Sequence, residues 1–153
     1  MNHLPSPTIL RALAVLAVPL AAAAAGAAPA PTLLRLEPEP SEHPTAVMRS
    51  TEQCIALVKA HDLGAAADPC QSAVVAAERE RASSWSAPFV TSATDESLAV
   101  AYNNRAVLNY LNGRLSLAAA DATRARHAAV LPGIDGNVAV IDAARRRAAS
   151  TPL

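Results

Sequence analysis

The residues best suited to covalent chemistry in this sequence are two cysteines, Cys54 and Cys70. Their spacing matches neither the C-x-x-C of a redox centre nor a zinc site, and no cluster of further ligands accompanies them. If a helical hairpin turns near Asp62, each cysteine lies eight residues from its centre and the two face one another. An even cysteine count favours a disulfide in a chain that reaches an oxidising compartment, with two free buried thiols as the alternative. We therefore predict a Cys54–Cys70 bridge.

The remaining nucleophilic and metal-binding side chains form no catalytic pattern. The 4 histidines are scattered, and no two are spaced to hold a metal on one helix face. The serines between residues 83 and 92 have neither a glycine elbow nor a positioned base. The sequence also lacks a phosphate loop, a paired-carboxylate arrangement and a dinucleotide fingerprint. We therefore predict a protein that is not an enzyme and that uses no cofactor and no metal.

The composition favours helices and argues against two classes of partner. With 13 basic and 13 acidic residues the formal charge is zero, so no electrostatic case arises for binding nucleic acid or an anionic membrane. Much of the 52% hydrophobic content is alanine, which favours helix but buries little area, and aromatic residues make up only 3%. Such a composition suits closely packed helices and suits a sheet badly.

Residues 1–27 have the features of a secretory signal peptide. A leader ending in Arg11 precedes an apolar stretch over 12–20, and the small residues at 25–27 fit an A-x-A cleavage pattern. A retained transmembrane anchor is the alternative, but the stretch is near the lower length limit for a span and is broken by Pro19. We expect a periplasmic or secreted protein with no stable membrane span after cleavage.

Two further segments follow the signal peptide. Residues 28–44 are rich in proline and glutamate, which hold a chain extended and solvated, so this segment is interpreted as a linker. Residues 45–150 carry helical periodicity and are expected to form one α-helical domain.

The helical part contains an internal repeat. At an offset of 52 residues, small side chains coincide with small ones and apolar side chains with apolar ones, which places them on matching helix faces. The matched pairs are Cys54 with Ala106, Ala66 with Ala118, Cys70 with Ala122, Ala73 with Ala125, Ile55 with Val107, Val58 with Tyr110, and Leu63 with Leu115.

Capping and breaking residues predict where the helices begin and end. In the second copy we expect helices over 96–112 and 114–129, the first of them capped by Asp95. In the first copy Pro69 is tolerable only in a first helical turn, so a helix should begin near Asp68. The chain should contain at least five helices, with breaks near Leu63, across 83–94, at 112–113 and at 132–133.

The second copy carries small residues and a turn glycine in a characteristic order. The run Ala101-Tyr102-Asn103-Asn104-Arg105-Ala106 is followed by Gly113, Leu115, Ala118, Ala122, Ala125 and Pro132. This pattern resembles a tetratricopeptide repeat, a helix–turn–helix unit of about 34 residues. The sequence departs from the family at Ala122, where an aromatic residue is usual, and at Pro132, which lies two residues late. The resemblance covers about residues 47–132.

The fold expected from this resemblance is all-α. It consists of two antiparallel helical hairpins, preceded by the signal peptide and the proline-rich linker. A further helix over 137–149 has an apolar face and three arginines at its C-terminal end, as expected of a capping helix over the last hairpin.

The resemblance also implies a binding groove on the concave face made by the first helix of each hairpin. Asn103 and Asn104 could clamp the backbone of an extended peptide there, since each amide offers both a donor and an acceptor; ordinary surface asparagines are the alternative. We expect Asn104 to face solvent and Tyr110 to line the groove. The groove positions of the family fall at Thr51, Glu52, Ile55, Val58, Asn103, Asn104, Val107 and Tyr110.

An insertion between the two copies holds Trp85 and Phe89, the only tryptophan and the only phenylalanine. These two residues either fold back to cover the hairpins or form an exposed anchor for a partner. The function expected overall is that of an exported, non-catalytic interaction module or scaffold with a protein or peptide partner. The alternative is a self-associating structural component of the cell envelope, which would be a homo-oligomer.

Overall fold

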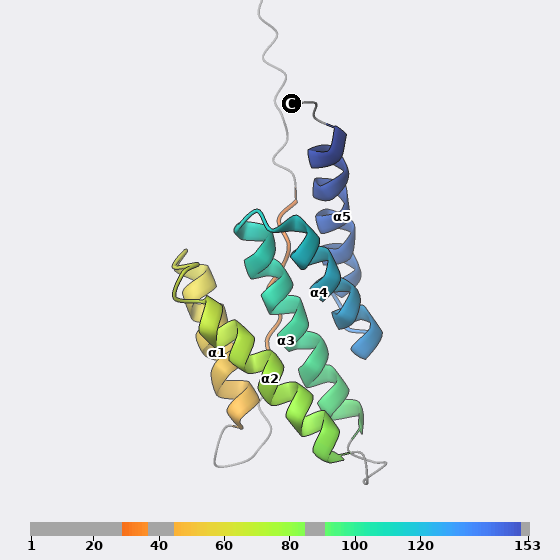
Figure 1. Ribbon diagram of the computed structural model, residues 1–153. Coiled ribbons are helices and arrows are strands. Elements are labelled where there is room, and N and C mark those ends of the chain that lie inside the picture. Colours follow the sequence, from red (N-terminus) through yellow and green to blue (C-terminus); the bar gives the residue numbers. More distant parts are fainter. Residues whose placement is uncertain (1–28, 37–44, 85–90, 151–153) are drawn as a thin grey trace, which may run out of the picture.

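The computed structural model describes residues 29–36, 45–84 and 91–150, and these residues form an all-α fold (Figure 1). No strand occurs within these ranges, and the predicted breaks near Leu63, at 112–113 and at 132–133 are found. The predicted signal peptide, residues 1–27, lies outside the described residues. The described residues contain five helices: α1 (Ala46–Lys59), α2 (Ala67–Ser83), α3 (Thr91–Leu111), α4 (Leu115–Ala128) and α5 (Ile134–Ser150).

The helices form two hairpins followed by a fifth helix. Helices α1 and α2 pack together, α3 packs with α4, and α2 joins the hairpins by packing against α3. Helix α5 packs on α4 and reaches α3 (Figure 1). Its Ile134 and Ile141 are buried, so α5 covers the open face of the second hairpin as expected of a cap. It begins at Ile134, one turn before the predicted 137–149.

The turns inside the two hairpins have the same geometry at the predicted offset of 52 residues. His61 in the first turn and Gly113 in the second both have positive φ, 57° and 71° respectively. Three backbone hydrogen bonds also recur: Ala60, His61 and Asp62 donate to Ala56, Val58 and Leu57, as Asn112, Gly113 and Arg114 donate to Leu108, Tyr110 and Asn109. The internal repeat is therefore present in the backbone as well as in the sequence.

Two helix starts test the sequence-based boundaries. Helix α2 begins at Ala67, so Pro69 lies in its first turn as predicted. Helix α3 begins at Thr91, earlier than predicted, and Asp95 is not its cap. Asp95 instead forms an ion pair with Arg81 of α2, with Nε and Oδ1 2.8 Å apart. The predicted break across 83–94 is therefore shorter than expected, and Trp85 and Phe89 lie outside the described residues.

The predicted disulfide is present. Cys54 and Cys70 are bonded, and their Cα atoms lie 4.8 Å apart, within the usual range for a bridge. In the second hairpin the equivalent residues are Ala106 and Ala122, which are buried in one cluster between α3 and α4. The disulfide thus occupies the place of a close alanine contact, because small side chains at these positions let the two backbones approach.

A buried carboxylate that the sequence did not single out joins three helices. Asp121 of α4, only 5% exposed in its side chain, accepts two hydrogen bonds from Arg105 of α3, at 2.8 and 2.7 Å. Asn109 and Arg124 also donate to it, and Arg105 donates further to Gln71 of α2. The hydrogen bond to Asp121 raises the pKa of Arg105, so the guanidinium stays charged. This network holds α3 in register against α2 and α4.

Candidate functional site

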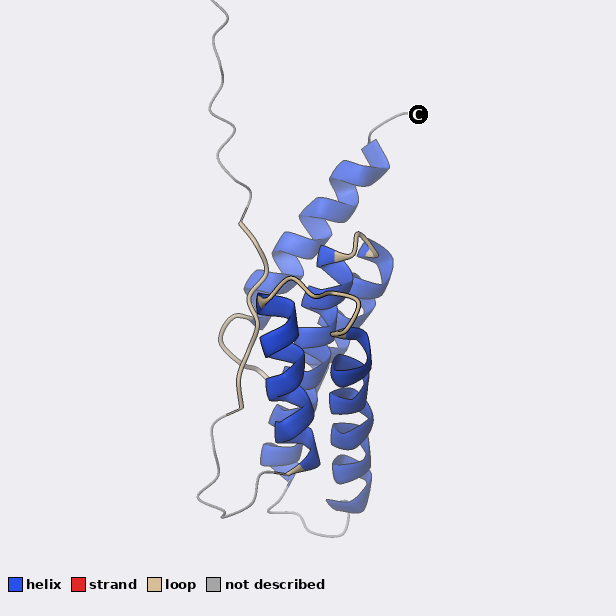
Figure 2. Ribbon diagram, turned by 90° about the vertical axis from the view of Figure 1, so that its left-hand side faces the viewer, coloured by secondary structure: helices blue, strands red, loops and turns tan. Residues whose placement is uncertain are grey.

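Three asparagines line one face of the helical stack. Asn103 and Asn104 lie on α3 and Asn137 lies on α5, and all three are buried, with Asn104 only 1% exposed. A buried amide needs partners for both its oxygen and its nitrogen, because burying an unpaired polar group is costly. The partners here come from residues 29–36, an extended segment that we call the arm (Figure 2).

The backbone of Thr32 is held by two of these amides. Its N–H donates to Asn137 Oδ1 at 2.6 Å. Its carbonyl oxygen accepts from Asn137 Nδ2 at 2.7 Å and from Asn103 Nδ2 at 3.0 Å. The amides also bond to one another, since Asn137 Nδ2 donates to Asn103 Oδ1 at 2.7 Å and Asn103 Nδ2 donates to Asn104 Oδ1 at 3.3 Å. The row of asparagines is therefore fixed in orientation.

The backbone of Leu34 is held by the third amide. Its N–H donates to Asn104 Oδ1 at 2.8 Å, and Asn104 Nδ2 donates to its carbonyl oxygen at 2.7 Å. Thr32 and Leu34 are two residues apart, so in an extended chain their N–H and C=O groups point to the same side. The asparagines thus contact the arm as a neighbouring β-strand would, at every second residue.

The side chains of the arm pack into the clusters on either side of this row. Leu33 packs with Cys54 and Val58 of α1 and Val107 of α3, and Leu34 packs against the cluster that contains Ile134 of α5. Leu36 packs against the cluster of α1, α2 and α3 residues around Val47 and Val74. Arg35 Nη2 lies 3.0 Å from Glu52 Oε2, with both side chains largely exposed. Three leucines are therefore half-buried while the arginine stays in solvent.

The structure brings most of the predicted groove residues together under the arm. Asn103, Asn104 and Glu52 contact it directly, and Val58 and Val107 form its apolar floor. Ile55 is also buried. Thr51, which stands at the repeat position of Asn103, is 1% exposed, and its hydroxyl has no hydrogen-bond partner in the described part of the chain. Tyr110 packs instead against the alanine cluster between α3, α4 and α5.

Two expectations need correction. Asn104 was expected to face solvent, but it is buried because the arm covers it. Residues 28–44 were expected to be a solvated linker, yet residues 29–36 lie against the helices. The physical reason is local: Leu33, Leu34 and Leu36 give the arm apolar area to bury, which the many prolines and glutamates of the whole segment obscure.

Sequence reasoning also missed Asn137. It stands 34 residues after Asn103, to which its amide donates, and 34 residues is the length of the repeat that the second copy resembles. The spacing of 34 residues between Asn103 and Asn137 was the feature of the sequence that could have identified Asn137 as part of the site. It places Asn137 on α5 where Asn103 lies on α3, so α5 contributes to the site as the first helix of a hairpin would.

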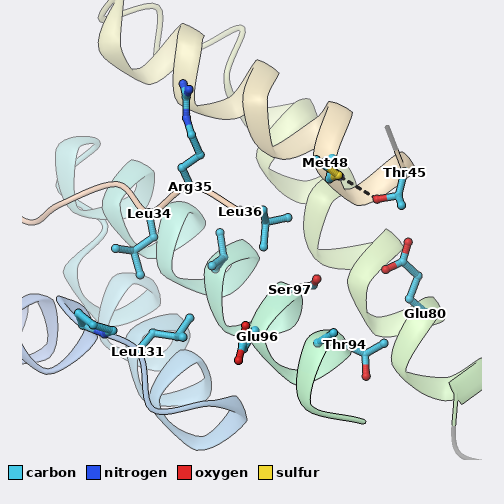
Figure 3. A pocket seen from close by; sticks show the side chains of 13 residues that line it. Leu34, Arg35, Leu36, Thr45, Met48, Glu80, Thr94, Glu96, Ser97 and Leu131 are labelled. Carbon is cyan, nitrogen blue, oxygen red and sulfur yellow. Dashed lines mark hydrogen bonds between the residues drawn. The ribbon is translucent and has the colours of Figure 1, made fainter. Parts of the chain in front are cut away.

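A cavity of about 610 Å³ continues the groove beyond Leu34 (Figure 3). It lies between the arm, the start of α1, the end of α2 and the start of α3. Most of its wall is apolar, and Glu80, Thr94, Glu96 and Ser97 add polar atoms. Burial raises the pKa of the Glu80 carboxyl.

The described residues contain no group of three or more side chains placed to hold a metal ion. No helix among them is both long and apolar enough to cross a membrane.

Removing one amide from the row of asparagines should make the arm detach more often. Asn104→Ala deletes both partners of the Leu34 backbone, and two hydrogen bonds at about 1 kcal/mol each correspond to about thirtyfold more frequent release of the arm. The hydrogen exchange rate of the Thr32 amide, which still bonds to Asn137, measures that release. Asn112→Ala is the control, because Asn112 only bonds to the end of its own helix. An unchanged Thr32 exchange rate in Asn104→Ala would show that the amide does not hold the arm.

Comparison of the chain with protein-family models, with curated proteins and with solved structures gave no match in any of the three.

Proposed function

We propose that this protein is an exported, non-catalytic interaction module that binds an extended segment of a partner protein in the asparagine-lined groove. The observation that carries the proposal is the contact between the three amides and the backbone of the arm. Asn104 and Asn137 each pair with both the N–H and the C=O of one residue, so they recognise an extended main chain whatever its side chains are.

The arm has the features of an internal ligand at such a site. It is a short extended segment whose main chain is held at one edge by hydrogen bonds to asparagine side chains. Its leucines pack against the clusters on either side. If the arm leaves, the asparagine row loses backbone partners that another extended chain would replace. The resemblance to tetratricopeptide repeats supports the same use of this face.

Export is the second part of the proposal. Its support is the signal-like sequence of residues 1–27 together with the Cys54–Cys70 bridge, since disulfides persist mainly in oxidising compartments. The periplasm or the extracellular medium would meet this condition.

The alternative is self-association through exchange of arms, which is favoured by the fact that the segment in the groove belongs to the chain itself. The connection to α1 opposes exchange, because a short tether gives the chain's own arm an effective concentration in the millimolar range. A second copy offers identical contacts without that advantage. Light scattering of the mature chain, residues 28–153, should therefore give the monomer mass at micromolar concentration.

The direct test uses a fluorescent peptide with the sequence of residues 29–36 and the mature chain. The wild-type chain should bind it poorly, because the tethered arm competes. A chain with Leu33→Asp and Leu36→Asp, which weaken its own arm, should bind the peptide at least tenfold more tightly in fluorescence anisotropy. Adding Asn104→Ala should weaken that binding about thirtyfold, whereas adding Asn112→Ala should leave it unchanged. If the Leu33/Leu36 variant keeps its helical content and binds no peptide, the groove is not a binding site.

A further inference from the structure

The arm lines only one part of the cavity beside it. Leu34, Arg35 and Leu36 form one of its walls, and Met48, Val100 and Leu131 provide apolar surface on the others (Figure 3). Val100 is 3% exposed, so this wall belongs to the folded core. The volume of the cavity, about 610 Å³, is that of a typical ligand pocket.

The arm contributes a leucine, Leu36, to the lining of this cavity, and leucine is smaller than an aromatic side chain. Leu36 is half-buried at the edge of the cavity, where its cluster includes Val47 and Leu98. Because Leu36 lines the cavity, a larger side chain at that position would cover more of its apolar wall. Such a side chain would gain apolar burial and van der Waals contacts that the arm lacks.

We infer that the partner segment, if the proposed function holds, carries tryptophan at the position that Leu36 occupies in the arm, with apolar residues at the positions of Leu33 and Leu34. The cavity adjoins the groove, so one extended segment reaches both. The indole ring offers more apolar surface than leucine does, and this surface suits the apolar wall. Its N–H would find acceptors among the hydroxyl and carboxylate oxygens at Thr94, Ser97, Glu80 and Glu96, which line the same cavity.

This ligand class explains how a partner displaces the arm. A segment with the same leucines would have to overcome a tethered competitor at millimolar effective concentration. Aromatic residues contribute heavily to binding when they fill a dry pocket. Tryptophan in the cavity supplies an interaction that the arm cannot make, and it therefore shifts the competition toward the partner.

The experiment compares two labelled peptides on the mature chain carrying Leu33→Asp and Leu36→Asp. One has the sequence of residues 29–36, and the other has tryptophan in place of the final leucine. The tryptophan peptide should bind at least tenfold more tightly in fluorescence anisotropy. Ser97→Phe, which fills the cavity from α3, should reduce its affinity to that of the leucine peptide while changing the leucine peptide less than about twofold. Ala93→Phe fills the same cavity from a more exposed position and serves if Ser97→Phe loses helical content.

The outcomes separate this inference from the function on which it rests. Equal affinities for the two peptides would overturn the inference and leave the groove intact as a binding site. A tryptophan preference that persists when the cavity is filled would also overturn it. Failure of both peptides to bind would overturn the proposed function itself.

Discussion

Asp121→Ala is expected to lower the free energy of unfolding by about 3–5 kcal/mol, the usual effect of removing one member of a buried ion pair. The substitution leaves the guanidinium of Arg105, whose side chain is only 17% exposed, without the carboxylate that accepts two of its hydrogen bonds. Gln71 alone cannot neutralise this charge. This loss is a large share of the free energy of unfolding of a small domain, which is about 5–15 kcal/mol.

Urea unfolding followed by circular dichroism measures this change, and Asp142→Ala is the matched control. Asp142 Oδ1 lies 3.6 Å from Arg145 Nη1 in an exposed ion pair on α5. Removing this carboxylate should change the free energy of unfolding by less than about 1 kcal/mol. A similar small change for both variants would mean that the Asp121 network does not hold the helices together.

The second large effect concerns the disulfide. Cys54→Ala with Cys70→Ala should lower the free energy of unfolding by about 3 kcal/mol, because the bridge closes a loop of fifteen intervening residues in the unfolded chain. The native helices should persist, since Ala106 and Ala122 form the equivalent contact in the second hairpin.

Reduction of the wild-type chain is the control for this variant, because it breaks the bond and keeps both sulfur atoms. Reduced wild-type protein and the double alanine variant should have nearly the same unfolding midpoint in urea, both well below that of the oxidised protein. If the oxidised and reduced proteins unfold at the same urea concentration, the bridge contributes no stability.

The fold could be predicted from the sequence because its signals are local. Alanine-rich helical periodicity, the first-turn position of Pro69 and the turn glycine at Gly113 each act within one or two helical turns. The disulfide followed from the same local geometry, since a hairpin turning near Asp62 sets Cys54 opposite Cys70. The start of α3 was missed because the helix extends a turn before Asp95, whose side chain pairs with Arg81 on another helix.

The site could be predicted only in part because its contacts are not local. Asn103 and Asn104 were recognisable as a backbone clamp from their adjacent amides. Their occupant was not, because residues 29–36 belong to a segment whose average composition is that of a solvated linker. Asp121 was equally hidden, since an acidic residue in an alanine-rich helix gives no sign that an arginine on another helix will bury it.

The arm and the helices that it contacts are far apart in the sequence, and this separation sets an order for folding. The hairpins close through contacts between neighbouring helices, whereas Thr32 bonds to Asn137 across 105 residues. Contacts between residues far apart in the chain form late, because closing a long loop costs more entropy. The arm, which is synthesised before the helices, therefore docks last, once α5 has folded onto α4. Each newly made molecule passes through a stage in which its helices are complete and its row of asparagines is open to any extended chain nearby.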